Sequence, residues 1–206
     1  GGETAERITT IETPLWVATL TNRGGAMLSW ELKNYNNVAG EAVSLVPEGE
    51  TAPRVEVEYG PGPLGTGDWV FEQAGGDAVL EEGDAPVVLR YEATRDDGVT
   101  VAKQYTFHSG SYLFDLKVEV YGLSDLAAQR ELSVGWPGIE PTEKREDKKA
   151  IASVAMIDGR ASREDLGGLR KVTAKKDVGA VEWATSQSRY FVAAVAPQDG
   201  VASELE

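Results

Sequence analysis

The stretch VVLRYEATRDDGVTVAKQYTFHSGSYLFDLKVEVY, residues 87–121, decides which class of fold the sequence predicts. Hydrophobic and polar residues alternate along most of it, and a period of two indicates β-strands with one buried face. Asp97-Gly98 is a strong hairpin signal, and HSGS is a short turn in which we expect Gly110 to adopt positive φ. The stretch therefore predicts three successive antiparallel strands between about residues 86 and 121.

The alternation also predicts which side chains of this stretch face the core. In VAKQYTF, one face carries Val101, Lys103, Tyr105 and Phe107. In SYLFDLKVEVY, the inward face carries Tyr112, Phe114, Leu116, Val118 and Val120. We expect Phe107, Phe114 and Leu116 to be core residues of paired long strands.

Shorter segments with the same period are found on both sides of this stretch. The candidate strands are PLWVATLT, AMLSWEL, RVEVEY, LSVGW, IASVAMI, LRKVTA, VEWAT and RYFVAAVAP. YGPGPLGTGDW and PTEKREDKKA are expected to be loops, and SREDL at most one helical turn. With no internal repeat and no shift in composition, the sequence predicts one domain over residues 1–206. Its class is all-β, a sandwich of antiparallel sheets with little helix.

Composition excludes several classes of function. The 206 residues include 34 acidic and 20 basic side chains, a net charge of -14, which disfavours nucleic acid and anionic membrane surfaces as partners. The chain has no cysteine, which excludes disulfides and zinc-thiolate sites. No apolar run approaches the ~20 residues of a membrane-spanning helix. The abrupt opening GGET suggests an excised fragment.

Residues suited to catalysis are few. His108, the one histidine, lies at a predicted turn. A Ser-His-Asp relay needs the histidine packed beside a serine and a carboxylate, and the position of Ser109 and Ser111 next to His108 in the sequence does not establish this. The acidic pairs Glu81-Glu82, Asp96-Asp97 and Glu164-Asp165 are expected in solvated turns. The sequence therefore predicts no catalytic residue, no cofactor and no metal site.

Five tryptophans are the remaining candidates for binding. Trp16, Trp30 and Trp183 fall within alternating strands, where core packing explains them. Trp69 follows the glycine-rich loop and Trp136 precedes a proline. We expect these two to be the candidates for a partly exposed groove that binds a sugar or an extended peptide.

The stretch TNRGGAMLSW, residues 21–30, predicts a tight hairpin. At least one of Gly24 and Gly25 should adopt positive φ, between a strand ending near Thr21 and one starting near Ala26. We expect Arg23 to be exposed, because a buried guanidinium needs a partner.

The order of these motifs resembles the large periplasmic domain of the bacterial YidC membrane protein insertases. The resemblance covers about residues 7 to 197. It begins with the RGG hairpin, which is also similar to the first hairpin of the galactose mutarotase superfamily. It continues with AVSLVPEG, ELSVGWPGI and the Tyr190-Phe191 pair. Its central motif, K-x-Y/F-x-F…G-x-Y, falls on Lys103, Tyr105, Phe107, Gly110 and Tyr112.

The resemblance implies a β-supersandwich of the galactose mutarotase type and a non-catalytic accessory role in membrane protein insertion. Sec translocon subunits or segments of nascent membrane proteins are the implied partners. The full-length protein is implied to be integral to the inner membrane, with its membrane helices, and the helical segment after the last strand, outside this chain. The alternatives are a carbohydrate-binding or aldose-epimerase-like protein of the same fold, and a structural spacer. The mutarotase enzymes rely on groove histidines and a glutamate, a set that one histidine does not supply.

Overall fold

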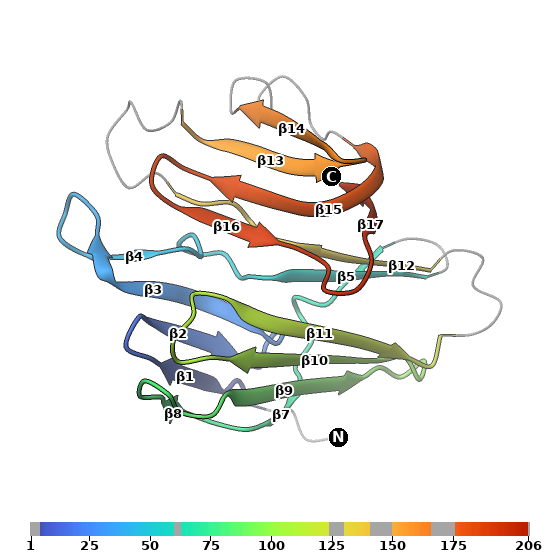
Figure 1. The fold of residues 1–206 in the computed structure, drawn as a ribbon. Helices are drawn as coiled ribbons and strands as arrows, with labels where there is room; N and C mark the ends of the chain where they lie inside the picture. Colours follow the sequence, from blue (N-terminus) through green and yellow to red (C-terminus); the bar gives the residue numbers. More distant parts are fainter. Residues whose placement is uncertain (1–4, 60–62, 124–129, 141–149, 166–175, 206) are drawn as a thin grey trace. The chain divides into compact units, whose positions relative to one another are not determined.

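The computed structural model describes residues 5–59, 63–123, 130–140, 150–165 and 176–205. These residues form strands β1 to β17 and contain no helix, which confirms the predicted all-β class (Figure 1). Accordingly, no described helix is long and apolar enough to cross a membrane. The chain divides into unit 1, residues 1–36 and 42–135, and unit 2, residues 37–41 and 136–206. The single domain over residues 1–206 remains a prediction.

One sheet of unit 1 contains the double-glycine hairpin and has the order β4-β3-β2-β1-β8. Its strands are β1 (Ile8–Glu12), β2 (Trp16–Thr21), β3 (Ala26–Asn36), β4 (Ala42–Ser44) and β8 (Ala78–Val79). Most pairs are antiparallel as predicted, but β8 runs parallel to β1, with Ile11 opposite Ala78. A two-residue strand at the sheet edge carries too little periodicity for this pairing to be predicted.

A second sheet of unit 1 contains the predicted three-strand meander and has the order β11-β10-β9-β7. Its strands are β7 (Glu72–Ala74), β9 (Val87–Thr94), β10 (Thr100–Phe107) and β11 (Phe114–Tyr121). Gly98, with φ 85°, closes the first hairpin as expected. Gly110 does not adopt positive φ, so that prediction was wrong. Six residues separate β10 from β11, and a connection of this length turns the chain without a left-handed glycine.

The third sheet of unit 1 has the order β12-β5-β6. Its strands are β5 (Arg54–Tyr59), β6 (Pro63–Gly65) and β12 (Arg130–Gly135). Val55 and Val57 are buried and Arg54 and Glu56 exposed, as the alternation predicted. β6 falls in the stretch predicted to be loop throughout. Proline is tolerated in it because an edge strand needs no donor on its outer side.

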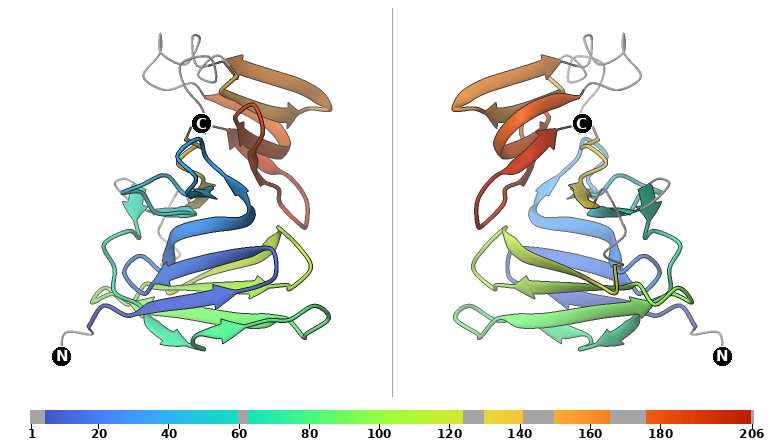
Figure 2. Two further views of the ribbon diagram at one scale, coloured as in Figure 1. Left: turned by 90° about the vertical axis from the view of Figure 1, so that its left-hand side faces the viewer. Right: turned by 90° about the vertical axis from the view of Figure 1, so that its right-hand side faces the viewer.

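The core of unit 1 is a cluster of aromatic rings between its first two sheets. Trp16 and Trp30, both buried as predicted, stack with their ring centroids 4.1 Å apart. The ring centroid of Phe107 lies 5.7 Å from that of Trp16, and the ring centroid of Phe114 lies 5.3 Å from that of Trp30. Each sheet therefore packs its aromatic face against the other. Phe107 is fully buried, which confirms its predicted place in the core. The two sheets appear as separate layers in Figure 2.

Two other predicted core residues are only half-buried. Phe114 and Leu116 both retain solvent exposure, although they point to the predicted side. The reason is their position on β11, which is the edge strand of its sheet and has a neighbour on one side only. The alternation identified the face of the strand but not its place in the sheet.

Unit 2 is one sheet in which β14, β13, β15 and β16 lie in that order and β17 also pairs with β15. The strands are β13 (Ala152–Ile157), β14 (Arg160–Asp165), β15 (Asp177–Gln187), β16 (Val192–Val195) and β17 (Ala202–Leu205). Within SREDL, Ser162 to Asp165 belong to β14 rather than to a helical turn, so Glu164-Asp165 lies in a strand, and Leu166 lies outside the described residues. All of LRKVTA, and all of PTEKREDKKA except Ala150, lie outside the described residues.

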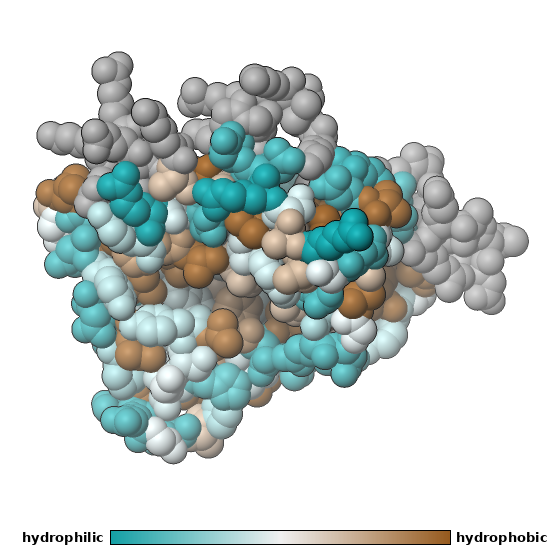
Figure 3. All heavy atoms as spheres, turned by 45° about the horizontal axis from the view of Figure 1, so that its top comes forward, coloured by the Kyte–Doolittle hydropathy of each residue, from teal (hydrophilic) through white to brown (hydrophobic). Residues whose placement is uncertain are grey.

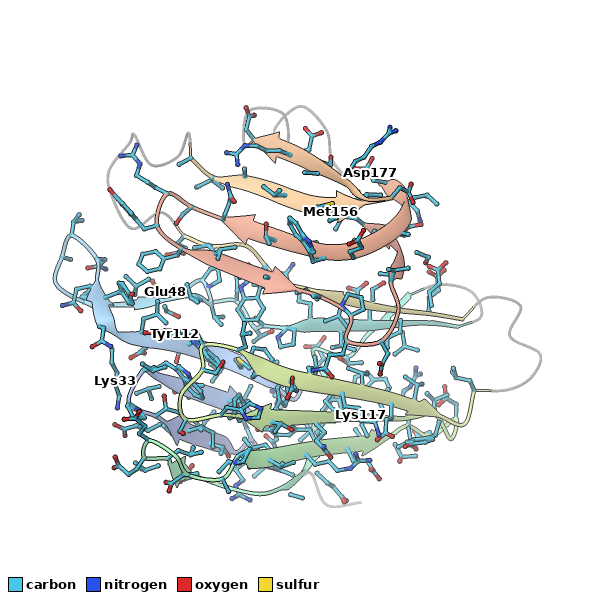
Figure 4. All side chains as sticks on the ribbon, in the orientation of Figure 1. Lys33, Glu48, Tyr112, Lys117, Met156 and Asp177 are labelled. Atoms are coloured by element: carbon cyan, nitrogen blue, oxygen red, sulfur yellow. The ribbon has the colours of Figure 1, made fainter. Side chains whose placement is uncertain are left out.

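The third tryptophan predicted for the core lies in this unit. Trp183 on β15 pairs with Met156 on β13. Met156 is labelled in Figure 4. Trp183 is half-buried rather than fully enclosed.

Candidate functional site

The double-glycine turn joins β2 to β3 as predicted. Gly24 has φ 75° and Gly25 has φ 53°, and Thr21 pairs with Ala26 at the base of the hairpin. Both glycines therefore occupy the left-handed region that side chains with a β-carbon avoid. The Arg23 side chain is 50% exposed and lies 3.8 Å from the Glu6 carboxylate, which confirms its expected exposure.

Neighbouring segments approach this turn closely enough to require glycine for a second reason. A β-carbon on Gly24 would lie 2.9 Å from the carbonyl oxygen of Gly67. One on Gly25 would lie 3.1 Å from the β-carbon of Tyr91. The Gly24 amide donates to the Trp69 carbonyl oxygen at 2.7 Å. The turn is thus held against residues 66–71, a contact that the sequence pattern did not predict.

Lys103 of β10 reaches the same turn from the other sheet. Its Nζ donates to the Gly24 carbonyl oxygen at 2.6 Å and to Thr66 Oγ1 at 2.8 Å. The residue is 1% exposed, and its ammonium lies 5.1 Å from the centre of the Phe71 ring. Burial lowers the pKa of Lys103 to about 7. Within the described chain no carboxylate pairs with this ammonium.

Tyr105 makes the second contact between the meander and the turn. Its hydroxyl donates to the Gly25 carbonyl oxygen at 2.7 Å, and burial raises its pKa above the ordinary value. Tyr91 lies beside it, ring centroids 5.9 Å apart, and burial also raises the Tyr91 pKa. Its hydroxyl finds no hydrogen-bond partner among the described residues.

We call the set Gly24, Gly25, Thr66, Lys103 and Tyr105 the glycine-turn clamp. Thr66 extends it to the third sheet, because its hydroxyl donates to the Val55 carbonyl oxygen at 2.8 Å. The clamp therefore joins all three sheets of unit 1. Lys103 is too enclosed to act on a substrate, and its contacts hold backbone segments together. The signal in the sequence was a lysine on the otherwise apolar face of its strand.

The two tryptophans proposed for a groove lie in different units. Trp69 is half-buried in unit 1, 6.1 Å from the Phe71 ring, with the Arg95 guanidinium 5.7 Å from its centre. Trp136 is half-buried in unit 2, directly after β12. The groove that they were expected to share remains a prediction.

His108 lies in the turn between β10 and β11, as expected. Its side chain is 42% exposed, and its Nε2 is 3.2 Å from Asp115 Oδ2. No serine hydroxyl of the described chain bonds to it.

The connection between β10 and β11, residues 108–113, presents two exposed hydrophobic side chains. We call it the hairpin tip. The Trp16 indole donates to the Ser111 carbonyl oxygen at 2.7 Å, and the Leu113 amide to Ser111 Oγ at 2.9 Å. Tyr112 is 42% exposed and Leu113 is 73% exposed. Tyr112 was predicted to face inward, which was wrong. It lies between the turn and the first residue of β11, so the alternation of that strand does not set the direction of its side chain.

Charged residues around the hairpin tip are paired. Lys33 lies 2.7 Å from Glu12, and His108 lies beside Asp115. The Lys33 amide also bonds to the Leu15 carbonyl oxygen, next to Trp16, which brings this ion pair near the tip (Figure 4). The tip thus presents two hydrophobic side chains beside an ion pair and a histidine–carboxylate contact.

Hydrophobic residues also occur elsewhere on the surface. The face in Figure 3 shows them interspersed with hydrophilic residues. What distinguishes the hairpin tip among the described residues is that two exposed large hydrophobic side chains, Tyr112 and Leu113, are adjacent in the sequence.

Comparison with known proteins decides the family. The family model of the YidC periplasmic domain matches residues 8–206. The chain belongs to the YidC periplasmic domain family. Membership places it on the periplasmic side of the bacterial inner membrane, as the sequence resemblance implied.

Curated relatives of this chain carry the name membrane protein insertase YidC. The one from Syntrophus aciditrophicus strain SB is 28% identical over 213 residues, covering 96% of this chain and 37% of the relative. The one from Nitratidesulfovibrio vulgaris strain DP4 is 31% identical over 197 residues, covering 92% of this chain and 36% of the relative. The chain thus spans little more than a third of these relatives' length.

The family resemblance has a spatial counterpart in the clamp. Two motifs suggested YidC, the RGG hairpin and the Lys103–Tyr105–Phe107 pattern. They contact each other through two hydrogen bonds, from Lys103 to Gly24 and from Tyr105 to Gly25. Motifs nearly 80 residues apart in the sequence are one structural element in the folded YidC domain.

Proposed function

We propose that this chain serves a bacterial membrane protein insertase as a non-catalytic docking domain in the periplasm. Its partners are Sec translocon subunits or segments of membrane proteins during insertion and folding. The observation that carries the proposal is the match of the YidC periplasmic domain over residues 8–206. The names of the relatives support the insertase as the parent protein.

The hairpin tip is the surface best suited to this role. Docking favours side chains that are exposed before binding and lose little freedom when bound. Tyr112 and Leu113 meet this condition, because the Trp16 indole and the Ser111 hydroxyl fix the backbone that carries them.

Site-specific photocrosslinking in the full-length insertase tests the proposal. A photoreactive phenylalanine replaces Leu113, and a matched one replaces Val88, which is 46% exposed on the solvent face of β9. We expect crosslinks to Sec subunits or nascent chains from position 113 and few from position 88.

Two results would count against the proposal. Equal yields from both positions would show contact without a preferred surface. No crosslink from position 113 in insertase that is active would show that the hairpin tip does not meet a partner.

A further inference from the structure

We propose that the glycine-turn clamp is a proton-responsive latch, in which protonated Lys103 favours local opening of residues 66–71 and neutral Lys103 favours the closed state. The geometry of a buried ammonium under a short surface segment points to it.

The surroundings of Lys103 offer hydrogen bonds but no opposite charge. Its neighbours across the sheet are Tyr91 on β9 and Val118 on β11, and Tyr105 lies two residues along its own strand. From the turn, Arg23 faces outward toward Glu6. From residues 66–71, Thr66 and Phe71 contact the ammonium, while Asp68 is exposed. The ammonium is therefore contacted only by neutral oxygens and one aromatic ring among the described residues.

The segment that covers this ammonium is anchored at its two ends by the buried residues Thr66 and Phe71 and is exposed between them. The Thr66 hydroxyl donates to the Val55 carbonyl oxygen, and the Asn22 side-chain amide donates to the Phe71 carbonyl oxygen. The Thr66 amide donates to the Val55 carbonyl oxygen at 3.2 Å, and the Phe71 amide to that of Asn22 at 2.9 Å. Between them, the Trp69 carbonyl oxygen accepts the Gly24 amide. Gly67 and Asp68 are exposed at the middle of the segment. Opening it gives Nζ access to water while the strands of the sheets remain paired.

The sign of the response follows from the two states of the lysine. In the closed state, burial lowers the pKa of Lys103 from its ordinary 10.5 to about 7, and the open state restores the ordinary value. The open state therefore binds more protons between these values, and falling pH favours opening until about pH 7. Between pH 9 and pH 7 the opening equilibrium should rise about 50-fold, and below pH 7 it should level off.

Hydrogen exchange of the Gly24, Thr66 and Trp69 amides measures this opening. Rates are corrected for the intrinsic effect of pH and compared between pH 7 and 9 in the whole chain. We expect the opening equilibrium to be about 50-fold larger at pH 7 in the unmodified chain. It should be independent of pH in Lys103→Met. Lys117→Met, which removes an exposed lysine of β11, is the matched control and should behave as the unmodified chain.

The same pH dependence in Lys103→Met would overturn the proposal. If that variant does not fold, a nuclear magnetic resonance titration of the Lys103 side chain in the unmodified chain decides. A midpoint near 7 supports the latch, and a midpoint near 10.5 overturns it.

Discussion

Replacement of Gly24 by alanine separates two demands that the turn makes on its sequence. Gly49 supplies the control, because its φ of 78° is close to the 75° of Gly24. It lies beside Glu48, which is labelled in Figure 4, and a β-carbon there would meet nothing within 4 Å. Gly49→Ala therefore tests the backbone conformation alone. Gly24→Ala tests the conformation together with the close approach of Gly67.

The expected loss of unfolding free energy is about twice as large in Gly24→Ala as in Gly49→Ala. Alanine in the left-handed region costs about 1–2 kcal/mol, and this cost applies to both variants. At Gly24 the new methyl group, 2.9 Å from the Gly67 carbonyl oxygen, must push residues 66–71 away. The displacement breaks the Gly24–Trp69 hydrogen bond and strains the Lys103–Gly24 bond, each worth about 1 kcal/mol. We therefore expect a loss of about 3–4 kcal/mol in Gly24→Ala and about 1–2 kcal/mol in Gly49→Ala.

Urea unfolding followed by circular dichroism measures both losses at one pH. The slope of the unfolding free energy should be the same in all three proteins, so that midpoints can be compared. Equal losses in the two variants would refute the close approach to Gly67. If neither variant loses unfolding free energy, the expected cost of alanine in the left-handed conformation would be refuted.

The remaining predictions concern the core, the clamp, the solvent face and activity. Phe107→Ala should cost about 3–5 kcal/mol in urea unfolding and Phe114→Ala clearly less, because only Phe107 is fully buried; the reverse order would contradict the packing. Tyr105→Phe should cost about 1–3 kcal/mol by leaving Gly25 without its donor, while Tyr91→Phe should cost little, since its hydroxyl has no described partner; similar losses would contradict this. Lys117 and Arg90 lower the pKa of Glu119 to about 2, so this pairing stabilises the fold above pH 4.5 and the benefit is lost as pH falls toward 2. Unfolding between pH 2 and 5 should show a smaller pH dependence in Glu119→Gln. We also expect no aldose mutarotase or glycosidase turnover from the chain, and turnover that disappears in His108→Ala or Asp97→Asn would contradict this.

Periodicity predicted what depends on local sequence. It identified β9, β10 and β11, the hairpin at Gly98 and the double-glycine turn, because alternation and glycine both act within a few residues. It placed Lys103 on the buried face, which is where the structure has it.

What periodicity could not predict depends on neighbours distant in sequence. The partners of Lys103 and the approach of Gly67 to Gly24 arise from packing between sheets. The half-burial of Phe114 arises from the edge position of β11, which no feature of its own residues reveals. Tyr112 continues the alternation of β11 but lies between the turn and the start of that strand at Phe114, where the two faces of a strand no longer apply.

The contact between the two family motifs is the central structural feature of this domain, and a double-mutant cycle measures it directly. The cycle combines Gly24→Ala with Lys103→Met and compares the double variant with the two single ones in urea unfolding at pH 8. Because Lys103 bonds to the Gly24 carbonyl oxygen, we expect the free-energy losses to differ from their sum by about 1 kcal/mol or more. Losses that add within about 0.5 kcal/mol would show that the two motifs are energetically independent and would contradict the clamp.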